Sequence, residues 1–176
     1  MKILLLLLLA INLQADIRQM TPVDLEKAAK AHAYPYYPED KITPGAINVS
    51  ATVKDVCTAG FTRDERHVTN AQKAKSFFDY RLTSNTEEDF KFGDYEVDHF
   101  FSLELGGSND QTNLWPQPYF VYPGARQKDA IETHLKHEIC RGHLTLDQAR
   151  WIIKTDWVNY YFNYKKIQPK YYIIKK

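Results

Sequence analysis

Apolar side chains recur at helical spacing in two stretches near the C-terminal end of the chain. Ile131, Leu135 and Ile139 follow one another at steps of four, which predicts an amphipathic helix over 124–141. Thr145 with Gln148 forms a capping-box start for a last helix. Its expected buried face consists of Leu146, Ala149, Ile153, Trp157 and Tyr160.

The N-terminal half predicts shorter elements. Thr21 before Pro22 is typical of a helix start, and that helix is expected to reach about residue 33. Thr69 predicts a second helix over 70–80, and 47–56 reads as extended chain. Between them, the proline-rich segment 35–45 breaks all regularity. This segment is either a linker to a dispensable arm or an ordered loop on the core.

The segment Tyr95–Gln117 predicts a hairpin that carries polar side chains at its strand ends. Asp98 and His99 close an apolar run, a Gly-Gly-Ser-Asn-Asp turn follows, and Asn113 opens a second apolar run. Neighbours on a regular strand point to opposite faces, so Asp98 and His99 can serve one site only if the strand ends or bulges there. Asn109, inside the turn, reads as turn chemistry.

The order DH, LGGSND and NLWPQ resembles the HNH nucleases of the His-Me finger, or ββα-metal, superfamily. The later segments KDAIETHL and TDWVNYY extend the resemblance to small secreted bacterial HNH proteins, over about residues 56–161. The resemblance implies an α+β fold, in which a ββα-metal finger made of the hairpin and the following helix is surrounded by additional helices.

The resemblance also implies the chemistry. His99 is the expected general base and Asp98 the expected metal ligand, while Asn113, the middle letter of HNH, is expected to keep the catalytic histidine aimed. The cofactor is one divalent metal ion, Mg²⁺ first, with Mn²⁺ or Zn²⁺ as alternatives. Relatives place a second ligand early in the following helix, but 120–123 offers none. The nearest oxygen donors are Gln117, Gln127 and Glu132, with His134 at a longer reach, and Glu132, beside the apolar stripe, is the one chosen as second ligand.

Charge is unevenly distributed along the chain. Segment 84–110 holds eight acids and one lysine, whereas 150–176 holds seven basic residues and one acid, interleaved with tyrosines. The acids suit a cation and the basic tail suits phosphates, although a solvated loop and a frayed terminus are the alternatives. Lys128, on the apolar stripe, either reaches solvent or meets an anion, a phosphate or Glu132. The expected nucleic-acid-binding residues are Arg126, Lys128, Lys165 and Lys166.

Residues 1–15 read as a signal peptide, because one lysine precedes a leucine-rich block too short to span a bilayer. We therefore expect a secreted or periplasmic protein, monomeric and without a membrane anchor after cleavage. Cys57 and Cys140 then predict one disulfide, worth roughly 4 kcal/mol from chain entropy. The expected organisation is the signal peptide, an N-terminal helix and loop over 16–44, and a nuclease domain over 45–176.

The expected function is a metal-dependent endonuclease that hydrolyses phosphodiester bonds of nucleic acid with little sequence specificity. DNA is favoured over RNA by analogy with the family. The alternatives are an exported nucleic-acid-binding module with an inactive finger, and a disulfide-stapled envelope protein that uses the hairpin structurally.

Overall fold

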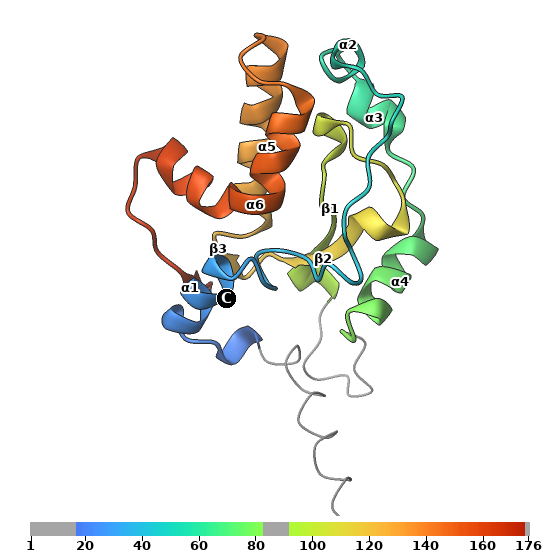
Figure 1. Cartoon of the computed structure of the whole chain (residues 1–176). Coiled ribbons are helices and arrows are strands. Elements are labelled where there is room, and N and C mark those ends of the chain that lie inside the picture. The colour runs from blue at the N-terminus through green and yellow to red at the C-terminus, as the bar shows by residue number, and fades with distance from the viewer. Residues whose placement is uncertain (1–16, 83–91, 175–176) are drawn as a thin grey trace, which may run out of the picture.

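The computed structural model describes residues 17–82 and 92–174, and the expected signal peptide lies outside them (Figure 1). The helices are α1 (Pro22–Lys30), α2 (Val53–Val56), α3 (Phe61–Glu65), α4 (Asn70–Asp79), α5 (Ala125–Cys140) and α6 (Leu146–Lys165). The strands are β1 (Tyr95–His99), β2 (Leu114–Pro118), β3 (Val121–Tyr122) and β4 (Tyr172–Ile173). They form two antiparallel pairs, β1 with β2 and β3 with β4, so the expected α+β class is confirmed.

Capping sequences fix where the helices begin. Thr21, Thr69 and Thr145 each accept a hydrogen bond from the backbone N–H three residues later and complete a capping box before α1, α4 and α6. Thr52 and Asp55 form a further box that starts α2. The expectation of extended chain is wrong at this point, because a cap followed by its partner at the third helical position favours a helical turn.

The β1–β2 hairpin has a long connection instead of a tight turn. Single turns of 3-10 helix at Leu103–Leu105 and Gln111–Asn113 lie on either side of the glycine-rich segment. Gly107 passes so close to the backbone that a Cβ atom would lie 1.7 Å from the carbonyl oxygen of Phe101. A glycine is therefore required there, and the loop folds back on the end of β1.

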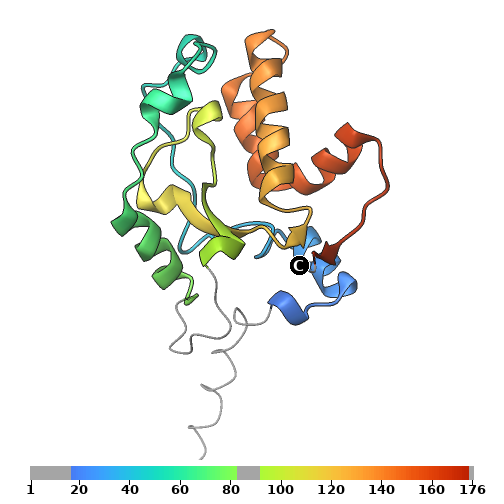
Figure 2. The ribbon, with the colours of Figure 1, turned by 180° about the vertical axis from the view of Figure 1, so that it is seen from behind.

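Helices cover the hairpin from two sides. Figures 1 and 2 show α5 and α6 packed together on one side of β1 and β2, with α3 and α4 on the other. The predicted apolar stripe of α5 is buried, and Trp115 and Trp157 are fully enclosed between the layers. No helix in the described residues combines the length and apolar character that spanning a bilayer demands.

The segment after α1 belongs to the core. The Trp157 indole N–H donates to the carbonyl oxygen of Tyr36 at 2.9 Å, and the Tyr36 hydroxyl donates to the carbonyl oxygen of Tyr122 at 3.3 Å. The hydroxyl of Tyr34 reaches the carbonyl oxygen of Pro116 on β2 at 3.2 Å. Of the two readings of the proline-rich segment, the ordered loop on the core is therefore the correct one.

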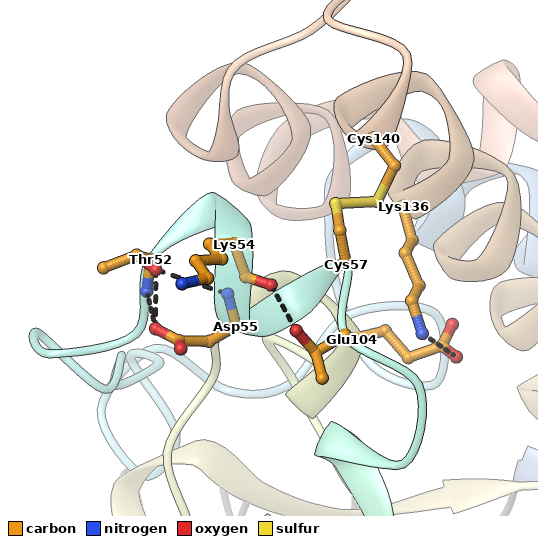
Figure 3. Close-up of a disulfide and its surroundings, with 8 residues drawn as sticks. Thr52, Lys54, Asp55, Cys57, Glu104, Lys136 and Cys140 are labelled. Atoms are coloured by element: carbon orange, nitrogen blue, oxygen red, sulfur yellow. Dashed lines mark hydrogen bonds and ion pairs between the residues drawn. A yellow bond between two sulfur atoms is a disulfide. The ribbon is translucent and has the colours of Figure 1, made fainter.

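The predicted disulfide joins Cys57, at the end of α2, to Cys140, the last residue of α5 (Figure 3). It closes an 83-residue separation with the two Cα atoms 5.7 Å apart. Beside it, Lys136 on α5 donates to Glu104 at 3.5 Å. The disulfide thus fixes α2 and the loop after β1 against the C-terminal half of α5.

Candidate active site

Asp98 and His99 open into the same cleft although they are neighbours on a strand. Both residues are in regular register with β2, opposite Trp115 and Leu114, and His99, the last residue of β1, lies at the edge where it also borders the cleft on the Asp98 side. Both side chains line a cleft of about 270 Å³. We call it the acidic cleft, because its lining includes five carboxylates, those of Glu96, Asp98, Glu104, Asp129 and Glu132.

Lys128 on α5 binds the end of β1 through hydrogen bonds to Asp98 and His99. Its ammonium donates to Asp98 Oδ2 at 2.6 Å, to the carbonyl oxygen of His99 at 2.9 Å, and to Glu132 one turn along the helix. The Lys128 side chain is 1% exposed. The prediction that Lys128 reaches solvent or nucleic acid is wrong, because its charge is used internally; the alternative that it meets Glu132 is confirmed.

Burial and charge shift the pKa values of Lys128 and Glu132 in opposite directions; with Asp98 we call these residues the buried trio. Burial lowers the pKa of Lys128, but the Asp98 and Glu132 carboxylates outweigh it, so the pKa of the ammonium is raised overall. Burial raises the pKa of the Glu132 carboxyl, against the opposing effect of Lys128. The ammonium is therefore held charged and fixes the position of the Asp98 carboxylate.

The remaining acids of the cleft repel one another. Burial, then the charges of Asp98 and Glu96, raise the pKa of Asp129 to about 6. Burial, followed by the charge of Asp98, also raises the pKa of Glu96. Carboxylates that raise one another's pKa in this way form a region of negative potential, which attracts cations.

Asn109 determines which nitrogen of His99 is free to accept a proton. The Asn109 Nδ2 group donates to the carbonyl oxygen of Glu65 at 2.6 Å, which turns its Oδ1 atom toward His99 Nε2 at 3.1 Å. Because Oδ1 can only accept, Nε2 carries the proton and the lone pair lies on Nδ1. Reading Asn109 as a turn residue alone is therefore incomplete: its partners come from segments distant in sequence.

The His99 imidazole is kept neutral at moderate pH. Burial lowers its pKa, while Asp98 and the hydrogen bond that His99 donates to Asn109 raise it, and Arg66 and Lys128 lower it further. The sum is a pKa below that of a free histidine. A neutral imidazole with a fixed tautomer has the properties of a general base.

Asn113 is fully buried and holds the loop to the end of β1. Its Oδ1 atom accepts from the Phe101 N–H at 2.9 Å and from the Ala46 N–H at 3.3 Å. Its Nδ2 group donates to the carbonyl oxygens of Phe101 and Ser108 at 2.9 and 2.8 Å. The contacts agree with the supporting role expected for this residue, which touches the loop and not the acidic cleft.

The cleft offers few protein ligands to a metal ion, so it suits a hydrated cation such as Mg²⁺ better than a metal held by protein ligands alone. The described residues hold no group of three or more His, Cys, Asp or Glu side chains converging as ligands. Asp98 lines the acidic cleft and gives only Oδ2 to Lys128, so one carboxylate oxygen stays free within the described contacts. Mg²⁺ needs little more, since it binds through one or two carboxylates, waters and substrate phosphates.

Glu132 also lines the acidic cleft and, like Asp98, gives one carboxylate oxygen to Lys128, so its expected role as second ligand stays a prediction. The Ser102 hydroxyl borders the acidic cleft as well, is buried and forms no hydrogen bond with the described residues. A metal-bound water in the cleft would find a hydrogen-bond partner in this hydroxyl. No sequence signal distinguished it.

The other expected nucleic-acid-binding residues lie apart from the acidic cleft. Arg126 is exposed at the start of α5, over the ring of Tyr119 at 5.7 Å. Lys165 is the last residue of α6 and Lys166 caps it, and Figures 1 and 2 place this end of α6 on the opposite side of the hairpin from α4. The structure therefore does not bring these basic residues together with His99.

Comparison with known proteins adds no relative. No protein-family model, no curated protein and no solved structure matches this chain.

Proposed function

We propose that the protein is an exported, metal-dependent endonuclease of the HNH type. The observation that carries the proposal is the shared cleft of Asp98 and His99, with each side chain fixed by its own partner. The order of β1, β2 and α5, with α5 contacting the end of β1 through Lys128, agrees with a ββα-metal finger. The resemblance in sequence over the same residues supports the same assignment.

In the proposed reaction, His99 Nδ1 takes a proton from the water that attacks the phosphorus atom. The Asn109 amide oxygen holds the opposite ring nitrogen and stabilises the imidazolium that forms. Asn113 keeps the loop that carries Asn109 in place. A divalent ion at the Asp98 carboxylate would supply positive charge to the phosphoryl oxygens and to the leaving oxygen.

The proposed substrate scope rests on the family likeness. A broad preference for DNA with little sequence specificity is proposed by analogy with the family. The protein would act outside the cytoplasm, in the periplasm or the medium, as the N-terminal sequence and the disulfide indicate.

Plasmid nicking tests the proposal. Purified wild type is incubated with supercoiled DNA in Mg²⁺, in Mn²⁺ and in EDTA, beside His99→Ala and the control His137→Ala, whose side chain is exposed on α5 away from the cleft. We expect nicking by wild type and His137→Ala with metal alone, and a loss of about 10²–10⁴-fold in His99→Ala at unchanged melting temperature. Equal nicking by both variants would refute the role of His99.

Two other classes predict different results. A nucleic-acid-binding module predicts retention of labelled DNA without nicking under every metal. A structural envelope protein predicts that His99→Ala and Asp98→Ala lower the melting temperature and change neither cleavage nor DNA binding.

A further inference from the structure

A second and larger cleft begins at His99 and runs along the other flank of β1. It lies between β1 and α4 and has a volume of about 530 Å³. We call it the β1–α4 cleft. It shares Arg66, Glu96 and His99 with the acidic cleft, so His99 stands where the two clefts meet. Figure 1 shows α4 lying beside the hairpin on the side away from α5.

The β1–α4 cleft combines an apolar floor with cations. Val97 and Tyr95 from β1 face Phe77 from α4, and the rings of Phe77 and Tyr95 meet edge to face at 6.1 Å. Arg66 and Lys73 also line it. Neither side chain forms an ion pair or hydrogen bond with any described residue, unlike Lys75 on the same helix, which pairs with Asp79 at 2.8 Å.

An exposed aromatic ring follows the cleft-lining residues of α4 along the helix. Asn70 and Ala74 line the cleft from α4, and Phe78 follows them at the next step of four, on the same helix face. Phe78 is 71% exposed. A large apolar ring open to solvent beside an apolar cleft is a platform on which a flat ligand can stack.

We propose that the β1–α4 cleft binds one strand of nucleic acid and leads it to His99. The inference rests on the proposed function and identifies the substrate-binding surface of the same site. Unpaired cations match backbone phosphates, and the apolar floor matches sugar and base faces. Strand β1, which supplies four lining residues, gives a floor roughly 13–16 Å long at about 3.3 Å per residue. A cleft of about 530 Å³ is the size of a pocket for a small ligand, so it suits a short single-stranded segment better than a double helix.

In this arrangement each end of the cleft has a separate task. Arg66, shared by both clefts, lies closest to the phosphate under attack. Lys73, one helical turn into α4, meets a neighbouring phosphate, and Phe78 stacks on a base beyond it. The basic end of α6 is not needed for this path.

Binding measured without turnover tests the inference. Fluorescence anisotropy of a labelled single-stranded oligodeoxynucleotide is followed with His99→Ala as the background, adding Lys73→Gln, Phe78→Ala or the matched control Lys75→Gln. Loss of one phosphate contact should reduce the slope of log affinity against log salt by about 0.7 in Lys73→Gln and leave it unchanged in Lys75→Gln. Phe78→Ala should weaken binding about 5- to 150-fold. Melting temperatures confirm that each variant is folded.

The outcomes separate this inference from the proposed function. Equal salt slopes for Lys73→Gln and Lys75→Gln, together with unchanged affinity in Phe78→Ala, would overturn the β1–α4 cleft even if wild type nicks DNA through His99. A reduced slope seen with duplex DNA alone would also overturn it, because the occupant would be a double helix. If the cleft variants weaken strand binding but no metal gives nicking, the binding surface stands and the endonuclease proposal fails.

Discussion

Replacing Lys128 by methionine should destabilise the protein far more than any exposed charge substitution. Lys128 is fully buried and is shared by the carboxylates of Asp98 and Glu132. Methionine keeps the length of the side chain but removes the ammonium, so the Asp98 carboxylate loses its counter-charge and the Glu132 carboxyl, whose pKa is already raised by burial, takes up a proton. Removing one partner from a buried pair costs about 3–5 kcal/mol.

Urea unfolding of wild type and Lys128→Met at pH 7 measures this cost directly. Lys136→Met is the matched control, because Lys136 lies on the same helix but its pair with Glu104 is longer, at 3.5 Å, and partly solvated. The control should lose less than about 1 kcal/mol. Adding Glu132→Gln to Lys128→Met should recover part of the loss, since the buried acid beside the unpaired Asp98 carboxylate is replaced by a neutral amide.

A cost below about 1 kcal/mol for Lys128→Met would refute the buried-trio reasoning. The pH dependence supplies a second check. Acidification protonates the stranded Asp98 carboxylate, so the difference between Lys128→Met and wild type should shrink as pH falls toward 4. A difference that stays constant over this range would mean that the loss arises from packing and not from charge.

The other predictions concern the pH dependence set by His99, the loop held by Asn113, and the disulfide. Wild-type nicking should lose activity on the acid side only at a pH below about 6.5, the pKa of a free histidine, because burial lowers the His99 pKa and the base must be neutral. Asn109→Ala should lower kcat and move this acid limb to lower pH, because the hydrogen bond that His99 donates to Asn109 raises the pKa of His99. Asn113→Ala should cost about 2–4 kcal/mol in urea unfolding, since four hydrogen bonds to buried loop atoms are lost. Replacing Cys57 and Cys140 together by serine should cost roughly 4 kcal/mol, and added reductant should then have no effect on the variant. A flat pH profile, a loss below about 0.5 kcal/mol for Asn113→Ala, or equal stability without the disulfide would contradict these three arguments in turn.

Local patterns in the sequence predicted most of the secondary structure. Thr21, Thr69 and Thr145 act through atoms only three residues away, so their effect can be read from the chain. The helix 125–140 and the pairing of β1 with β2 follow in the same way from apolar periodicity. The disulfide followed from an even cysteine count in a chain whose N-terminal sequence is expected to be a signal peptide.

The parts that sequence could not give depend on contacts between distant segments. Lys128 lies on the apolar stripe of α5, and its inward position is explained only by the Asp98 carboxylate, to which its ammonium donates. Asn109 looks like an ordinary turn residue until the carbonyl of Glu65 fixes its amide. Lys73 gives no signal at all, because a free lysine on a helix is unremarkable until β1 is placed beside it.

The burial of Tyr36 against α6 limits where this protein can be truncated. A chain trimmed to begin at residue 45 would leave the Trp157 indole without its acceptor and remove a fully enclosed tyrosine from the interior. Cleavage studies on such a fragment would report on a damaged molecule. The amino-terminal third thus folds together with the half that carries the candidate site, and the two should be expressed as one piece starting no later than Ile17.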